Sequence, residues 1–167
     1  MPDGGHAFEP SSKTDAKASM YTVHQVEDVE DYVCVRNNIP CKIKLIMTVK
    51  NPKNKDGPRK RLFVAIDVFT GKVFKATFSL TGTCVVPRVT YTDYQLVDIF
   101  EDDSYVTLLD DKGNLELNVK LPTKEALRSL IKVGFAEGKD VFVSVVSAMG
   151  RAEIIASYVR DYVQDPK

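Results

Sequence analysis

The sequence lacks several residues and patterns that catalytic, metal-binding and membrane-spanning proteins commonly carry. Its 167 residues include no tryptophan and two histidines, His6 and His24. Neither histidine has a Ser or Cys partner in its sequence context, so no nucleophilic catalytic set is indicated. No apolar run reaches the roughly eighteen residues of a membrane helix, and no signal-peptide pattern is present. We therefore expect a cytoplasmic protein that is not an enzyme, has no membrane partner and needs no cofactor.

Cysteines and clustered acidic residues are the remaining candidates for a metal site. The cysteines form no C-x-x-C pair, and each lies in or beside an apolar run: Cys34, Cys41 and Cys84. We expect these thiols to be reduced, buried and unreactive. Four carboxylates lie in turn-like segments without the ligand spacing of a calcium loop: Asp102, Asp103, Asp110 and Asp111. We expect them to be solvated turn residues, and we predict no metal site.

Charge is unevenly distributed along a chain whose formal net charge is zero. The part up to Ser19 has two basic and three acidic residues, a net charge of −1. The part from there to Val89 has twelve basic and six acidic residues, net +6, and the remainder has nine and fourteen, net −5. This asymmetry suggests two domains. The domain in the middle part, with a net charge of +6, is expected to face nucleic acid.

The middle part contains a twelve-residue segment, 50–61, which we call the basic tip. It holds one acidic residue, Asp56, and six crowded cations: Lys50, Lys53, Lys55, Arg59, Lys60 and Arg61. Two prolines and a glycine at its centre exclude a helix and an uninterrupted strand. Apolar residues alternate with mostly polar ones on both sides of it: Ile43, Leu45, Met47 and Val49 before, with Ile46 out of phase, and Leu62, Val64, Ile66 and Val68 after. The pattern predicts a hairpin that buries these alternating side chains and carries the basic tip at its end.

Short alternating segments separated by tight turns continue on both sides of this hairpin. Residues 1–19 are predicted to be a disordered tail, because they are rich in Gly, Pro and Ser. Five short strands in residues 20–88 fit a small β-barrel, and we interpret Val85-Val86-Pro87 as the joint that follows it. In residues 89–163, three strands, a helix and two more strands match an OB-fold, with 164–167 as a second tail. The helix is predicted to start at a Thr123 cap and end at Gly138, with one apolar stripe: Leu127, Leu130, Ile131 and Phe135.

Two interpretations of the basic tip remain open from the residues alone. Lysine-rich segments often only raise solubility or act as localisation signals, so a solvated loop is one interpretation. Placement at the end of a hairpin favours the other, in which the cations contact phosphates together. Tyr91 and Tyr94, near the joint, fit either core packing or stacking on bases.

Several stretches resemble a known family, and they occur in the same order from about residue 14 to 160. They are Thr14-Asp-Ala-Lys-Ala-Ser19, Pro40-Cys-Lys-Ile43, Ile66-Asp-Val-Phe-Thr-Gly-Lys72, Val86-Pro87, Tyr94-Gln-Leu96 and Ser147-Ala-Met149. Together they resemble eukaryotic translation initiation factor 5A, a family related to archaeal factor 5A and bacterial elongation factor P. The resemblance implies an all-β protein with one short helix: an SH3-like barrel, 20–88, followed by an OB-fold barrel, 89–163.

The resemblance also implies a modified lysine in the basic tip. In that family the tip reads Thr-Gly-Lys-His-Gly-His-Ala-Lys, and deoxyhypusine synthase begins the conversion of its first lysine to hypusine with an aminobutyl group from spermidine. Aligned from Gly57, Lys55 takes the modified position. Lys53 is a competing alignment, because the connection to the strand is longer here. Asn54 and Asp56 replace the glycine and histidine that flank the family's lysine.

By the same resemblance, the protein is expected to be a translation factor in elongation and termination. It implies binding to the ribosome beside peptidyl-tRNA through the cations of the basic tip, which are Lys50, Lys53, Lys55, Arg59, Lys60 and Arg61. A weak homodimer remains an open prediction. The first alternative is a structural protein that self-assembles without hypusine, which resembles the Woronin-body protein of filamentous fungi. The second is a general RNA-binding module without ribosome specificity.

Overall fold

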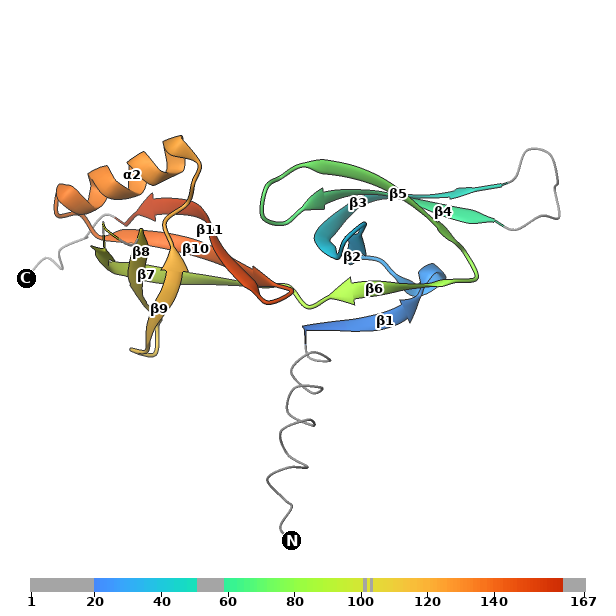
Figure 1. Ribbon diagram of the computed structural model, residues 1–167, viewed down its shortest axis with the longest axis horizontal. Coiled ribbons are helices and arrows are strands. Elements are labelled where there is room, and N and C mark those ends of the chain that lie inside the picture. Colours follow the sequence, from blue (N-terminus) through green and yellow to red (C-terminus); the bar gives the residue numbers. More distant parts are fainter. Residues whose placement is uncertain (1–19, 51–58, 101, 103, 161–167) are drawn as a thin grey trace, which may run out of the picture. The chain divides into compact units, whose positions relative to one another are not determined.

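The computed structural model describes residues 20–50, 59–100, 102 and 104–160. The chain divides into two units (Figure 1), one ending at Val89 and also including Ala148–Gly150, the other made of Thr90–Ser147 and the residues from Arg151 on. The predicted tails, 1–19 and 164–167, lie outside the described residues, as do 51–58, 101, 103 and 161–163.

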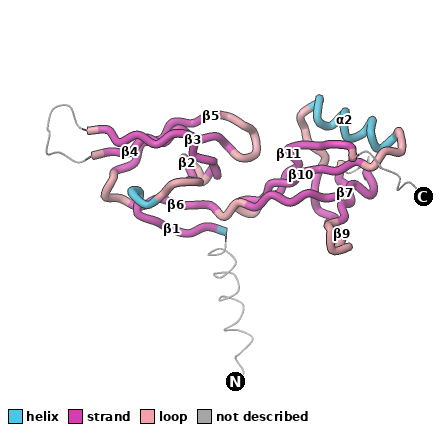
Figure 2. The backbone as a smooth tube through the Cα atoms, turned by 180° about the vertical axis from the view of Figure 1, so that it is seen from behind, coloured by secondary structure: helices cyan, strands magenta, loops and turns pink. Residues whose placement is uncertain are grey.

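The first unit is built of antiparallel strands and one 3-10 turn. Its elements are β1 (Tyr21–Gln25), η1 (Val26–Asp28), β2 (Tyr32–Val35), β3 (Ile39–Val49), β4 (Lys60–Asp67), β5 (Val73–Ser79) and β6 (Thr83–Pro87). They form a two-stranded sheet, β1-β6, and a four-stranded sheet, β2-β3-β4-β5. The sheets curl around a common core as a half-closed barrel (Figure 2).

The interpretation of Val85-Val86-Pro87 as a joint was wrong. These residues belong to β6, which pairs with β1 from Thr83 opposite Gln25 to Pro87 opposite Tyr21. The described part of this unit therefore has six strands, where the sequence indicated five. Pro87 is tolerated because it is the last residue of its strand, where a missing N–H interrupts little of the ladder.

The predicted buried face of the hairpin was also wrong beyond Ile43. The β3-β4 register shifts between Ile43, which faces Ala65, and Leu45, which faces Val64. A bulge of this kind adds one residue to a strand and moves the following side chains to the opposite face. The side chains predicted to be buried after the bulge are therefore substantially exposed: Leu45 by 50%, Met47 by 48% and Val49 by 43%.

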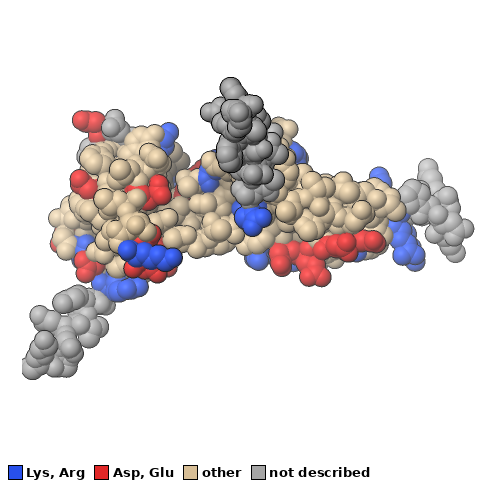
Figure 3. Space-filling model, turned by 90° about the horizontal axis from the view of Figure 1, so that it is seen from below, with Lys and Arg blue, Asp and Glu red and all other residues tan. Residues whose placement is uncertain are grey.

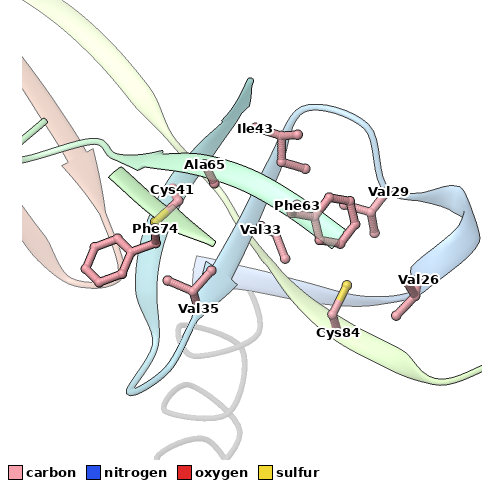
Figure 4. Packing of buried hydrophobic residues seen from close by; sticks show 10 residues of the cluster. All are labelled: Val26, Val29, Val33, Val35, Cys41, Ile43, Phe63, Ala65, Phe74 and Cys84. Carbon is pink, nitrogen blue, oxygen red and sulfur yellow. The ribbon is translucent and has the colours of Figure 1, made fainter. Parts of the chain in front are cut away.

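The core of the first unit lies against the other face of the same strands. Phe63 and Ala65 of β4 are fully buried there, and Ile46 packs against this core. The ring of Phe63 lies 5.6 Å from the ring of Phe78 in β5, centroid to centroid. Figure 4 shows Phe63 among side chains contributed by strands on both sides of the barrel. In β4, and in β3 beyond Ile43, the core is thus made by the residues between those that the alternation had marked.

The three cysteines are buried in this unit and free of disulfides, as expected. Burial, together with the nearby Asp67 carboxylate, raises the pKa of the Cys41 thiol from its ordinary 9.0 to about 12. Burial likewise raises the pKa of the Cys34 thiol to about 11. Both side chains are held in the unreactive thiol form at neutral pH, because the thiolate is the reactive species.

The second unit is a five-stranded barrel with one α-helix. Its elements are β7 (Thr90–Phe100), β8 (Tyr105–Leu109), β9 (Leu115–Lys120), α2 (Glu125–Ala136), β10 (Val141–Ala148) and β11 (Arg151–Val159). The strand order is β11-β10-β7-β8-β9, and the two outer strands, β9 and β11, also approach each other. The order of strands and helix is that of an OB-fold, so the predicted fold class is confirmed.

The helix α2 differs from the prediction at its start and on one side. Its N-cap is Lys124, with no side-chain capping bond, so the predicted Thr123 cap was wrong. Gly138, with φ of 75°, follows its end as predicted, and its N–H donates to the Phe135 carbonyl at 3.0 Å. Ile131 is buried, whereas Leu130 is exposed, so the apolar stripe is narrower than predicted.

Candidate nucleic-acid interface

Strand pairing places the basic tip at the end of the β3-β4 hairpin. The ladder of these two strands continues until Val49 faces Lys60, and residues 50–59 connect them. The side chains of Lys50, Arg59 and Lys60 are exposed. The carbonyl of Arg59 accepts a hydrogen bond from the Leu80 N–H at 3.0 Å, which ties this end of the hairpin to the turn after β5. The described cations therefore stand at the end of a paired ladder.

Two of the six predicted binding residues, Lys53 and Lys55, lie in 51–58, outside the described residues. The hypusine candidate and its neighbours are among them. Three others, Lys50, Arg59 and Lys60, lie where the paired part of the hairpin ends. The sixth is Arg61, described below. The predicted binding role of each residue stays a prediction.

Arg61 makes contacts that the sequence did not indicate. It is half-buried, and its Nη1 donates to the Glu27 carbonyl at 3.0 Å and, more weakly, to the Val26 carbonyl at 3.4 Å. Its Nε is buried and has no hydrogen-bond partner among the described residues. The guanidinium thus links the hairpin to η1, some 34 residues earlier in the chain. In this geometry Arg61 positions the base of the basic tip.

The first unit also carries an acidic segment around η1, separate from the cations at the end of the hairpin. Its exposed carboxylates are Glu27, Asp28, Glu30 and Asp31. In Figure 3, acidic side chains gather along one edge of this unit, and basic ones stand where the described strands of the hairpin end. A polyanion is repelled by the first group and attracted by the second, so the charge pattern favours approach at the tip.

Known proteins resemble the chain along most of its length. Residues 88–157 match the family described as eukaryotic elongation factor 5A hypusine, DNA-binding OB fold. Eukaryotic translation initiation factor 5A-4 of Solanum tuberosum is 46% identical over 158 residues, which is 93% of this chain and 96% of the relative. The chain belongs to the eukaryotic translation initiation factor 5A family. It is therefore a translation factor and not an enzyme, and the family implies association with the ribosome.

Further relatives agree with this assignment. Eukaryotic translation initiation factor 5A-1 of Medicago sativa is 45% identical over 159 residues, covering 93% of this chain and 95% of its own. The solved structure of a translation initiation factor eif-5a family protein from Naegleria fowleri superposes with a TM-score of 0.73 at 32% identity, over 83% of this chain and 99% of that one. Initiation factor 5A from Methanococcus jannaschii, with a TM-score of 0.55 at 17% identity, covers 83% and 95% and shares the fold.

The structure also describes several other residues that the sequence raised as candidates for a functional site. His24 is exposed, and its Nε2 hydrogen-bonds with Thr22 Oγ1 at 2.8 Å. Within the described ranges, no group of three His, Cys, Asp or Glu side chains could hold a metal ion. Asp110 is a turn residue, as predicted: its carboxylate accepts N–H bonds from Asn114 and Lys112, which lower its pKa.

Tyr94 is half-buried and packs against the second core, whereas Tyr91 is exposed. No described helix combines the length and the hydropathy that crossing a membrane requires.

One polar cluster on the second unit could not be predicted from the sequence. Asp93 of β7 accepts hydrogen bonds from the hydroxyl groups of Ser144 in β10, at 2.7 Å, and Tyr158 in β11, at 3.1 Å. The Tyr158 ring stacks on Phe142 at 5.5 Å, and Arg160 lies over that ring at 4.5 Å. These partners are 51 and 65 residues from Asp93, so no local motif reveals them.

Proposed function

We propose that this factor works in the cytoplasm on the ribosome, beside peptidyl-tRNA, and assists peptide-bond formation and termination. The observation that supports the proposal is the position of the basic tip, whose flanking strands stay paired up to Val49 and Lys60. Membership of the initiation factor 5A family makes RNA on the ribosome the polyanion that such a tip would meet. A long paired hairpin with cations at its end suits insertion into a narrow cleft between RNA backbones.

The cations of the tip contribute through their phosphate contacts. Lys50, Arg59 and Lys60 are exposed at its two ends, and Lys53 and Lys55 lie between them in sequence. Each lysine or arginine that neutralises a phosphate releases bound counterions, which makes the interaction favourable and dependent on salt. Binding of this kind fixes position along RNA and reads no base sequence.

We assign Lys55 as the candidate site of hypusine, with deoxyhypusine synthase as the enzyme that begins the modification. The added aminobutyl group lengthens the side chain and supplies a second amine, so the cation reaches further toward tRNA. Asp56 follows it directly and offsets part of this charge, although solvent screens such a pair. Intact mass and peptide mapping of the protein from its native cells test the assignment. A hypusine mass on the Lys55 peptide is expected, and fully unmodified Lys55 there refutes it.

Co-sedimentation with ribosomes tests the proposed binding itself. The test variant carries four neutral replacements in the tip: Lys53→Gln, Lys55→Gln, Arg59→Gln and Lys60→Gln. The control variant changes net charge by the same amount at exposed positions elsewhere: Lys44→Gln, Lys75→Gln, Lys112→Gln and Lys124→Gln. We expect the tip variant to lose most of its ribosome-bound fraction and the control variant to keep it. Equal binding by the wild-type protein and the tip variant would show that the tip does not carry the interaction.

A further inference from the structure

One face of the hairpin sheet is apolar although the core lies on the other side. We define the outer face by the rows of paired residues in β3, β4 and β5 that point away from the core. The rows are Lys42–Ile66–Val73, Leu45–Val64–Lys75, Met47–Leu62–Thr77 and Val49–Lys60–Ser79. Seven of these positions are aliphatic or methionine. The bulge after Ile43 brings the three from β3 onto this face.

Several apolar side chains of this face are substantially exposed. Leu45, Met47 and Val49 are each exposed by more than 40%, and Val73 of β5 by 56%. Leu62, Val64 and Ile66 of β4 lie between them and are half-buried. Isolated exposed aliphatic residues need no explanation, but a contiguous patch framed by polar side chains marks an interaction surface. The fold does not require this patch, because the Phe63 core is formed by the opposite face.

Positive charge frames the apolar patch. Lys60 and Lys75 are exposed within it, and Lys42 stands at its far end, with its Nζ 4.8 Å from the centre of the Tyr32 ring. None of the positions of the outer face carries a carboxylate. An occupant must therefore supply both apolar side chains and negative charge.

We propose that the outer face docks an acidic amphipathic segment of a partner protein. A second copy of this chain fits less well, because two lysine-framed faces repel each other. Seven apolar positions are also few beside the roughly 20–30 residues that each partner contributes to a stable interface. RNA matches the lysines but leaves the apolar centre in contact with phosphates. A helix with one apolar and one acidic side satisfies both parts of the surface.

The position of the outer face links this docking to the basic tip. Its last row contains Val49 and Lys60, the two residues where the hairpin ladder ends. A segment bound along the face ends beside the tip and adds negative charge there. The partner thereby lowers the attraction of the tip for RNA, or is displaced when the tip binds. This inference goes beyond ribosome binding, and the face can be tested without ribosomes.

The test measures binding of a synthetic peptide to the whole protein by fluorescence anisotropy. The peptide has about 18 residues of leucine and glutamate, with leucines at helical spacing, and its counterpart has lysine in place of glutamate. The double variant Leu45→Thr/Met47→Thr keeps strand propensity and removes apolar contact. A matched control is Leu115→Thr/Leu117→Thr in β9, whose side chains are exposed by 58% and 55%.

We expect the acidic peptide to bind the wild-type protein and the β9 control equally, and the face variant about tenfold more weakly. Lys75→Glu, a single surface change, is expected to weaken binding of the acidic peptide and to leave the fold intact. Amide shifts in the nuclear magnetic resonance spectrum are expected in β3, β4 and β5.

Three results would overturn the proposal. One is equal affinity of the face variant and the wild-type protein, and another is tighter binding of the lysine peptide. The third is self-association of the wild-type protein that the face variant abolishes, which would make a second copy the occupant. If Leu45→Thr/Met47→Thr fails to fold, unchanged acidic-peptide affinity in Lys75→Glu overturns the proposal by itself.

Discussion

The two faces of the β3-β4-β5 sheet are both apolar, yet they have opposite surroundings. On the inner face, Phe63 and Ala65 are fully buried against side chains from the rest of the first unit. On the outer face, Leu45 and Met47 are about half exposed. The same strands thus stabilise the fold with one face and leave the other for binding. Hydrophobic character alone does not tell the two roles apart; burial does.

The largest expected effect lies at the centre of the inner face. Phe63→Ala removes a fully buried ring, together with its contact to Phe78, and leaves a cavity. We expect the free energy of unfolding to fall by about 3–5 kcal/mol, measured by urea denaturation. A loss below about 1 kcal/mol would mean that the inner face is not the core, and the comparison of faces would fail.

Arg61, at the tip end of the inner face, is expected to have an intermediate effect. Arg61→Met keeps much of the aliphatic stem but removes the donors to the Glu27 and Val26 carbonyls. A loss of roughly 1–2 kcal/mol in the free energy of unfolding is expected, because partly buried bonds from a charged group are replaced only in part by water. Arg61→Lys, which keeps one cationic donor, should lose less. If both variants are as stable as the wild-type protein, the link to η1 contributes nothing.

The buried thiols predict that stability falls in alkali. The pKa of Cys41 is raised to about 12 in the folded protein, whereas the unfolded chain has the ordinary value of 9.0. The unfolded state therefore loses its proton first, and the stabilisation is complete below pH 9 and lost as the pH rises toward 12. At pH 9.5 we expect a loss of about 1 kcal/mol from this thiol. Urea denaturation between pH 8 and pH 10 measures it, and Cys41→Ala serves as the control. An equally steep decline in Cys41→Ala would assign the effect to other groups.

The smallest effect is expected on the outer face. Met47→Thr exchanges a half-exposed side chain for one with high strand propensity. The free energy of unfolding should change by less than about 0.5 kcal/mol. Thermal unfolding of the two variants measures the contrast between the faces: the midpoint should change little in Met47→Thr and fall strongly in Phe63→Ala. A loss comparable with that of Phe63→Ala would show that the outer face is part of a core.

The alternation of apolar residues sufficed to predict most strands, the hairpin and the two-barrel plan. It could not predict which side of the hairpin is buried. Ile43, Leu45, Met47 and Val49 keep perfect period two in sequence, but the bulge at residue 44 adds a step that periodicity does not register. Ile46 is apolar at a position where the alternation predicts a polar residue, and this was the sign of the bulge. Because both faces of β4 are apolar, its pattern could not correct the error.

The remaining misses concern contacts between residues far apart in the sequence. Strand β6 is short, contains two valines and ends in proline. It cannot be distinguished from a linker in the sequence until its partner β1 is known. The basic character of the tip could be predicted from composition, and its placement from the hairpin. The link from Arg61 to η1 could not, because it joins residues 34 positions apart through backbone carbonyls that have no signature in sequence.

The dependence of ribosome affinity on salt tests the central claim most directly. Ribosome binding of the wild-type protein is compared with that of Lys53→Gln/Lys55→Gln/Arg59→Gln and of a control with equal charge, Lys75→Gln/Lys112→Gln/Lys124→Gln. Each phosphate contact contributes roughly 0.7 to the slope of log affinity against log salt, so the tip variant should lose about 2 from that slope. The control variant should keep the wild-type slope. Equal slopes for all three proteins would contradict the assignment of the basic tip as the RNA-binding element.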